Sequence, residues 1–188
     1  MPTFRTSRPV SAADAAVPHI VLVGLPGSGK SSVGRALADA LGRNFLDFDA
    51  EIERREGVTI AEIFAAHGEA RFRSLERTLT EELRGLGNYV LAPGGGWATN
   101  PGCLALLKPP AIVIYLQVEP ARALKRMAGG IESRPLLSRP DPHAELTKIL
   151  HGREATYLLA DHTVRVDFLR ESEVVATIVA LAAKERPD

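Results

Sequence analysis

Short apolar and β-branched runs alternate along the chain with longer segments in which apolar residues recur every three or four positions. The short runs are typical of buried strands, and the longer segments are typical of amphipathic helices. Strands are predicted at residues 19–23, 44–48, 89–92, 111–117 and 163–167. Helices are predicted at residues 30–41, 59–66, 68–86, 101–107, 120–127, 142–159 and 171–184. Because strands alternate with helices, we expect an α/β fold with a parallel sheet covered by helices on both faces.

Residues at the element boundaries support this interpretation. Thr59 begins the sequence Thr-Ile-Ala-Glu, which is a capping box, and Asn100 and Asp141 each precede a proline that suits the first turn of a helix. Residues 49–87 contain helices with no strand between them. We expect this insertion to form a side wall over the carboxyl ends of the strands, where open α/β folds bind ligands.

Length and composition indicate one domain. The chain has 188 residues, 45% of them hydrophobic, which is enough for a single core. We assign residues 19–188 to that domain. Residues 1–18 combine Arg, Ser, Ala and Pro with one acidic residue. For them we expect a frayed tail, with a short organelle-targeting leader as the alternative.

Charge and cysteine content narrow the class of partner. The 23 basic residues balance 23 acidic ones, so no overall field favours nucleic acid or an anionic membrane. The longest apolar stretch, residues 174–183, is too short to span a bilayer. The one cysteine, Cys103, is typical of a reducing compartment, and we expect a cytoplasmic protein. No apolar helix stripe is left over, so we also expect a monomer.

A glycine-rich motif joins the first predicted strand to the first predicted helix. Residues 24–31 read Gly-Leu-Pro-Gly-Ser-Gly-Lys-Ser, the pattern of a phosphate-binding loop in the setting it requires. The Lys30 ammonium can reach the β- and γ-phosphates, and the Ser31 hydroxyl can ligate Mg²⁺. The residues expected to contact nucleotide are Gly27, Ser28, Gly29, Lys30, Ser31 and Ser32. The motif therefore predicts binding of ATP or GTP with Mg²⁺.

Two carboxylates follow the second predicted strand. Asp47 and Asp49 are two residues apart, so they share one face and emerge at the carboxyl end of the sheet. One can serve the metal, directly or through water, and the other can face an acceptor hydroxyl. The alternative is that the pair caps a helix at residues 50–56.

Two more segments suggest an anionic small-molecule acceptor. Arg71 and Arg73 flank Phe72 in the helical insertion, with Phe64 nearby. An arginine fork beside an apolar wall suits a carboxylate, although such a segment is also typical of a solvated helix face. Residues 94–96 are three consecutive glycines, which favour a turn where a ligand approaches backbone N–H groups over a plain tight turn.

Residues 128–141 have the composition of a lid. Gly129 and Gly130 precede Arg134, and glycines before a loop with one arginine are typical of a segment that brings positive charge to a transferring phosphoryl group. A surface loop is the alternative. Arg153, in the helix that follows, is a second candidate anchor for an anionic substrate, or else a surface salt-bridge residue.

These segments, in this order, resemble the shikimate kinase family. The matching segments are GLPGSGKSS at 24–32, DFD at 47–49, ARFRSLE at 70–76, GGG at 94–96, RPLL at 134–137 and an Arg-to-Tyr segment at 153–157. The resemblance implies a nucleoside-monophosphate-kinase-like P-loop fold with a five-stranded parallel sheet in the order 2-3-1-4-5. It also implies transfer of the ATP γ-phosphate to the 3-hydroxyl of shikimate, toward chorismate and the aromatic amino acids. Residues 49–87 would bind the substrate and residues 128–141 would form the lid.

The resemblance also implies roles on the nucleotide side. Lys30 resembles the lysine that clamps the phosphates, and Ser31 resembles the Mg²⁺ ligand, with Asp47 near the water shell of the metal. Arg134 is similar to the lid arginine that contacts the ATP phosphates. Arg126 resembles a residue that borders the adenine.

On the acceptor side, Asp49 resembles the carboxylate that holds the acceptor hydroxyls, as a base or as an orienting group. Arg73 and Arg153 resemble the two arginines that grip the shikimate carboxylate. The backbone of Gly95 and Gly96 resembles the acceptor-side amides.

The chain departs from the family pattern at two places. Trp97 follows the glycines where the family usually has a small residue, and we expect its indole to narrow or reshape the acceptor side. Glu154-Ala-Thr-Tyr157 replaces the usual Pro-Leu-Tyr, so the helix is expected to continue without a kink.

Other functions remain open at this point. A gluconate-type kinase would share the loop and the fold, and a non-catalytic ligand-sensing domain would share the fold without needing the catalytic residues. GTPase switching is disfavoured because the chain has no base-reading Asn-Lys-x-Asp segment.

Overall fold

A computed structural model describes residue 4, residues 12–127 and residues 140–185. Its strands are β1 (Ile20–Val23), β2 (Asn44–Asp47), β3 (Tyr89–Ala92), β4 (Ile112–Gln117) and β5 (His162–Arg165). Its α-helices are α1 (Lys30–Leu41), α2 (Phe48–Glu56), α3 (Ile60–Leu83), α4 (Cys103–Leu107), α5 (Pro120–Arg126), α6 (Pro142–Tyr157) and α7 (Glu171–Lys184). Two short 3-10 helices, η1 (Ala12–Ala16) and η2 (Trp97–Thr99), complete the described elements. None of these helices is long and apolar enough to cross a membrane.

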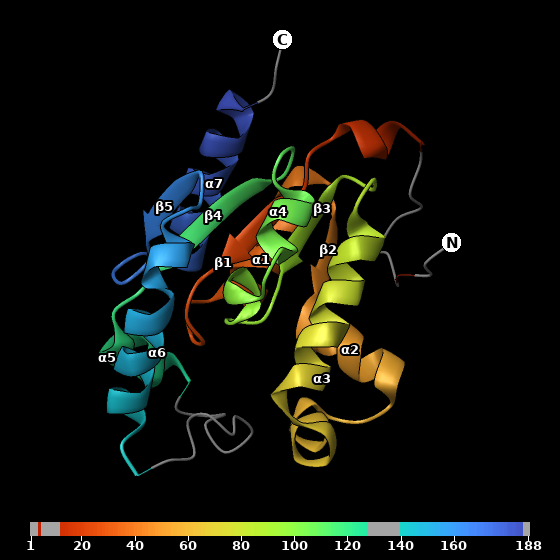
Figure 1. Cartoon of the computed structure of the whole chain (residues 1–188). Coiled ribbons are helices and arrows are strands. Elements are labelled where there is room, and N and C mark those ends of the chain that lie inside the picture. The colour runs from red at the N-terminus through yellow and green to blue at the C-terminus, as the bar shows by residue number, and fades with distance from the viewer. Residues whose placement is uncertain (1–3, 5–11, 128–139, 186–188) are drawn as a thin grey trace.

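All five strands form one parallel sheet in the order β2-β3-β1-β4-β5, which confirms the predicted order. β1 lies in the middle, and its loop leads into α1. In Figure 1, α2 and α3 lie beside β2 on one flank, and α5 and α6 lie on the opposite flank. The carboxyl ends of the strands therefore open between two helical walls.

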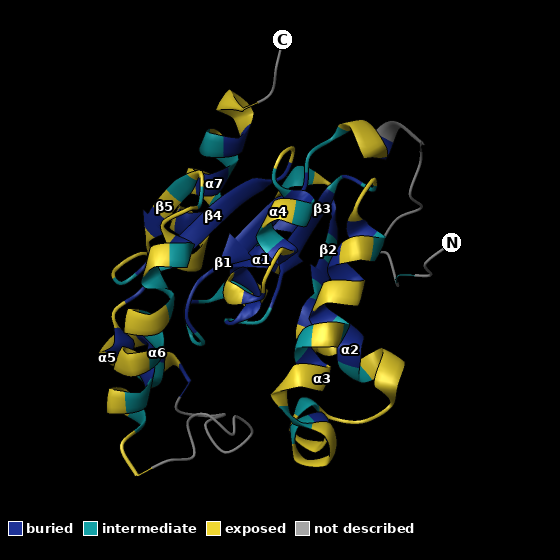
Figure 2. Ribbon diagram, viewed as in Figure 1, coloured by how far each residue is buried: buried dark blue, intermediate teal, exposed yellow. Residues whose placement is uncertain are grey.

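The core divides into two clusters, one on each face of the sheet. Along β1, Ile20 and Leu22 belong to the cluster that also contains buried residues of α1 and α7. Val21 and Val23 belong to the other cluster, with buried residues of α2, α3 and α4. Successive strand residues point to opposite faces, so a strand buried on both faces is apolar throughout. Figure 2 shows the sheet buried and the outer faces of the helices exposed.

Several helix boundaries differ from the prediction, and two of the differences are set by a glycine. The helices predicted at 59–66 and 68–86 form one element, α3, whose backbone is non-helical only at Gly68 (φ 74°, ψ 179°). The predicted capping box at Thr59 is confirmed. The helix predicted to begin after Asn100 begins at Cys103 instead, because Gly102, with φ at 81°, is its N-cap. Asn100 ends the turn of η2, and its side chain donates to the backbone oxygen of Arg73 (2.8 Å).

Part of the segment assigned to a frayed tail packs on the domain. Residues 12–16 form η1, and Asp14 is buried and accepts a hydrogen bond from the Asn88 side chain (2.6 Å). A methyl group added at Gly87 would lie 2.1 Å from the backbone oxygen of Asp14, so the backbones at these two residues are in close contact. The frayed-tail expectation does not hold for residues 12–18.

Candidate active site

The loop between β1 and α1 has the backbone of a phosphate cradle. Gly24, Gly27 and Gly29 have φ angles of 145°, 80° and 96°, which only glycine adopts without strain. A methyl group at Gly27 would also lie 2.5 Å from the backbone oxygen of Ala123, so the loop packs directly on α5. Lys30 begins α1, and its ammonium donates to the oxygens of Gly24 (2.9 Å) and Leu25 (3.0 Å). The lysine side chain therefore spans the loop from its last residues back to its first.

Ser31 and Asp47 bring two hard oxygen ligands together. The Ser31 hydroxyl donates to Asp47 Oδ2 (2.6 Å). Asp47 Oδ1 accepts from the backbone N–H groups of Asp49 (3.1 Å) and Ala50 (3.3 Å), so the same side chain caps α2. The capping and metal-binding interpretations of Asp47 are therefore compatible. A hydroxyl beside a carboxylate is the oxygen chemistry that Mg²⁺ prefers.

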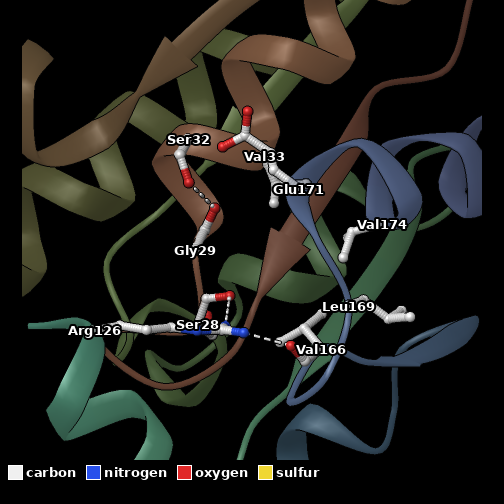
Figure 3. Close-up of a pocket in the computed structure, with 9 residues that line it drawn as sticks. All are labelled: Ser28, Gly29, Ser32, Val33, Arg126, Val166, Leu169, Glu171 and Val174. Carbon is white, nitrogen blue, oxygen red and sulfur yellow. Dashed lines mark hydrogen bonds between the residues drawn. The ribbon is translucent and has the colours of Figure 1, made fainter.

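A cavity of about 200 Å³ lies beside the loop, between α1 and the β5–α7 connection. Ser28 lines it, and its buried hydroxyl has no hydrogen-bond partner among the described residues. Arg126 lines the cavity from α5 and donates to the backbone oxygens of Ser28 (3.5 Å) and Val166. Figure 3 shows this guanidinium between the loop and Val166. The Ser28 hydroxyl and the Arg126 guanidinium therefore line the space into which a nucleotide bound at the loop would extend.

The glycines after β3 lie against the predicted acceptor-binding side chains. A methyl group at Gly94 would lie 3.1 Å from Asp49 Oδ1. One at Gly95 would lie 3.4 Å from Arg153 Nη1, and one at Gly96 would lie 2.3 Å from Arg73 Nη2. These glycines do not have positive φ angles, so they are small because side chains approach them, not because of a special turn. The structure thus brings together Asp49 of α2, Arg73 of α3 and Arg153 of α6 around one backbone turn.

Arg73 is held by two carboxylates. Its Nη1 donates to Glu76 Oε2 (2.7 Å), and its Nε and Nη2 donate to Glu69 Oε1 (3.1 Å and 2.7 Å). Glu76 is fully buried, whereas Glu69 is largely exposed. Burial raises the pKa of Glu76 to about 7, against the opposing effect of Arg73, and the negative charge of Asp49 also raises it. Glu76 fixes the direction of the guanidinium.

Arg153 is supported by its own helix. Tyr157 lies one turn further along α6, and its hydroxyl donates to the backbone oxygen of Gly95. Arg153 hydrogen-bonds to Tyr157, and burial raises the pKa of this tyrosine. Helix α6 continues through residues 153–157, as expected from the absence of proline. The continuous helix therefore places Arg153 beside the glycine turn.

The sequence matches the family model described as shikimate kinase over residues 26–183. A shikimate kinase from Pelotomaculum thermopropionicum is 40% identical over 161 residues, which cover 86% of this chain and 93% of that protein. The chain belongs to the shikimate kinase family. A shikimate kinase from Acinetobacter baumannii in complex with shikimate has a similar structure, with a TM-score of 0.86 and 37% identity over 94% of this chain and 98% of that one. A gluconokinase from Sinorhizobium meliloti, with a TM-score of 0.58, 20% identity and coverage of 89% of this chain and 92% of that one, shares the fold alone.

Trp97 does not lie at the acceptor side, where the sequence suggested it. Its side chain is 0% exposed, and its Nε1 donates to the Thr80 hydroxyl (2.8 Å). The indole also meets Phe48 edge to face, with ring centroids 6.2 Å apart. It therefore lies in the core behind the glycine turn, and the expectation that it narrows the acceptor side is wrong.

Two other predicted residues lie outside this cluster. Arg71 pairs with Glu56 (3.0 Å) on the exposed face of the insertion, so only Arg73 of the proposed fork reaches the glycines. Arg134, and residues 128–139 of the predicted lid, lie outside the described residues.

Glu76 is the residue of the candidate site that the sequence did not suggest. It ends the family segment ARFRSLE and stands three positions after Arg73, so the two share one helix face. An acidic residue between apolar positions of a buried face would have identified it.

Proposed function

We propose that this protein transfers the γ-phosphoryl group of ATP to the 3-hydroxyl of shikimate, with Mg²⁺. The observation that carries this proposal is the convergence of Asp49, Arg73 and Arg153 on the glycine turn. That turn adjoins the phosphate loop, since a methyl group at Gly95 would lie 3.1 Å from Pro26 Cδ. A carboxylate, two guanidinium groups and a phosphate cradle are the groups that a kinase of a hydroxy-carboxylic acid needs.

On the nucleotide side, the loop N–H groups and Lys30 bind the phosphates, and the Ser28 and Ser32 hydroxyls lie beside them. Arg126 borders the base from α5. Ser31 and Asp47 would hold Mg²⁺, which supplies neutralisation of phosphate charge when bound. Among the described residues no three His, Cys, Asp or Glu side chains gather as a metal site. This fits an ion that takes its other ligands from phosphate and water.

On the acceptor side, Arg73 and Arg153 grip the carboxylate of shikimate from two different helices. This grip orients the ring so that its 3-hydroxyl meets Asp49, and the backbone of Gly95 and Gly96 lines the site. The acceptor oxygen forms the new bond to the γ-phosphorus as the bond from that phosphorus to the β,γ-bridging oxygen breaks, and ADP leaves. The hydroxyl proton passes to Asp49 as the phosphoryl group transfers. Arg134 adds positive charge to the transferring group, a role that rests on the family pattern of residues 134–137.

Initial rates of ADP release test the proposal. Purified protein is assayed with ATP, Mg²⁺ and either shikimate, quinate, gluconate or no acceptor, and the four rates are compared. We expect turnover that depends on shikimate, and loss of that turnover in Lys30→Met with the melting temperature unchanged, because Lys30 supports no core. ADP release that is equal with and without shikimate contradicts the proposal. Nucleotide binding without turnover on any acceptor favours the ligand-sensing alternative.

We also propose that the enzyme is a monomer of the cytoplasm. The support is its zero net charge and its single, buried free thiol at Cys103. Light scattering that gives the mass of one chain, 20.2 kDa, is the expected result, and twice that mass contradicts the monomer.

A further inference from the structure

The connection between β5 and α7, residues 166–170, forms one side of the nucleotide cavity. Val166 and Leu169 line the cavity from this connection, opposite Ser28 and Gly29 of the phosphate loop (Figure 3). The connection has no helix or strand of its own. Its position therefore depends on contacts with neighbouring elements.

Three consecutive residues of this connection are tied to α5. The Val166 oxygen accepts from Arg126 Nη2, and Asp167 Oδ1 accepts from the backbone N–H of Glu119 (2.9 Å). The Arg122 guanidinium lies over the ring of Phe168, 4.2 Å from its centroid. Arg122 and Arg126 are four positions apart, so their side chains lie on one side of α5, and Glu119 is the N-cap residue before that helix. The three contacts therefore extend from the N-cap of α5 to its last residue.

Phe168 has no place in the core. Its side chain is 84% exposed, which is the largest exposed fraction among the exposed large apolar residues of the described chain. An exposed phenylalanine costs little stability to remove. The planar Arg122 guanidinium against its ring is a cation–π contact with short, favourable geometry.

We propose that Phe168, through Arg122, is a positioning residue for the nucleotide. It does not touch the cavity itself, whereas its neighbour Leu169 does. The contact between this ring and Arg122 fixes the middle of the connection against α5. Val166 and Leu169 are thereby kept at the side of the cavity, where the base of the nucleotide would lie. The inference rests on the proposed use of ATP and names a residue that tunes nucleotide affinity without contacting the acceptor.

The test measures the dissociation constant of ADP with Mg²⁺ by calorimetry, alongside KM for ATP, KM for shikimate, kcat and melting temperature. We expect Phe168→Ala to raise the ADP dissociation constant and the ATP KM about two- to five-fold, the range of an exposed cation–π contact. KM for shikimate, kcat and melting temperature stay as in the wild type. Phe168→Tyr keeps an aromatic ring and should bind ADP as the wild type does. Phe168→Leu keeps only apolar bulk and should bind ADP as weakly as Phe168→Ala.

Two further variants separate the contact from a general surface effect. Arg122→Ala should match Phe168→Ala, and the double variant should be no weaker than either single variant, because both remove the same contact. Leu159→Ala is the matched control, since Leu159 is 59% exposed in the turn that follows α6. We expect it to bind ADP as the wild type does.

Unchanged ADP affinity in Phe168→Ala, wild-type affinity in Phe168→Leu, or additive losses in the double variant would overturn the inference. If the wild type fails to phosphorylate shikimate, the proposed function fails, and the ADP titrations still decide the role of Phe168.

Discussion

At the carboxyl end of β3, each of three consecutive glycines faces a different charged side chain. Arg73, Arg153 and Asp49 come from three helices. A Cβ atom would overlap Arg73 at Gly96 (2.3 Å), would lie tightly against Asp49 at Gly94 (3.1 Å), and would only touch Arg153 at Gly95 (3.4 Å). The sequence could predict a close approach at residues 94–96, since three glycines are otherwise unfavourable. It could not show that the approaching groups are the protein's own side chains, because these are distant along the chain.

Gly96→Ala tests this packing. The new methyl group would lie 2.3 Å from Arg73 Nη2 and 2.7 Å from its Cζ, so the guanidinium must move. We expect KM for shikimate to rise about ten-fold or more, with KM for ATP unchanged, since a loss of roughly 1.4 kcal/mol is ten-fold in affinity. Initial-rate kinetics with each substrate varied separate the two effects.

Gly152→Ala is the control for this variant. Gly152 is next to Arg153, yet a methyl group there would meet nothing within 4 Å. It lies inside α6, where alanine stabilises a helix by roughly 0.5–1 kcal/mol over glycine. Wild-type kinetics with a slightly higher melting temperature are expected. An equal rise of the shikimate KM in both variants would refute the steric explanation.

Glu76 gives the stability of the protein a pH dependence. Its pKa is raised to about 7 in the fold, chiefly by burial, from an ordinary value of 4.5. Between these values the folded protein binds more protons than the unfolded chain, so stability falls as pH rises. Relative to Glu76→Gln, we expect the free energy of unfolding of the wild type to fall by up to about 3 kcal/mol over this range and to level off above it. Urea unfolding of both proteins from pH 5 to 8 measures this, and a difference that does not vary with pH contradicts it.

At the scale of elements, α2 begins beside the proposed Mg²⁺ site. Asp47 caps this helix through Oδ1 and accepts from Ser31 through Oδ2. One side chain thereby fixes the start of the helix that carries Asp49 and the position of the proposed Mg²⁺ ligand. The sequence posed these two interpretations as alternatives, because spacing alone does not show that two oxygens of one carboxylate serve both.

Asp47→Asn separates the two roles. Asparagine caps a helix as well as aspartate does, so the melting temperature should stay near that of the wild type. The lost charge should raise the Mg²⁺ concentration for half-maximal activity by about ten-fold or more, as removal of a group that supports a metal ligand does. Asp47→Ala should show the same Mg²⁺ effect and also lose about 1 kcal/mol of stability. Wild-type Mg²⁺ dependence in Asp47→Asn would exclude the metal role.

The strands were more predictable than the helix boundaries. Buried strands are continuous apolar runs, and the predicted span of β3 agrees with the structure to the residue. Helix α4 starts two residues later than predicted, because Gly102 in a left-handed conformation competes with the Asn100-Pro101 signal. The kink lies at Gly68, the first residue of the second predicted helix, so this glycine marked the break even though the element continues.

At the scale of the whole molecule, the sheet order creates the site. β1 lies between β3 and β4, so the phosphate loop emerges where the order of strands reverses, and open α/β sheets bind ligands there. Segments after β2 and β3 carry Asp49 and the glycine turn, which are the proposed acceptor side. Segments after β4 and β5 carry Arg126 and Val166, which line the cavity proposed to hold the nucleotide. The predicted order placed these segments, whereas the buried positions of Glu76 and Trp97 required the packed structure.

The hydroxyl that receives the phosphoryl group decides whether the proposed function is right. Phosphorus NMR of the wild type with ATP, Mg²⁺ and shikimate measures this directly. We predict one phosphate monoester signal, coupled to the ring proton at carbon 3 of shikimate, which grows as ATP is consumed and ADP forms. A signal of free phosphate alone, or of phosphate on a different hydroxyl, would contradict the placement of the 3-hydroxyl against Asp49.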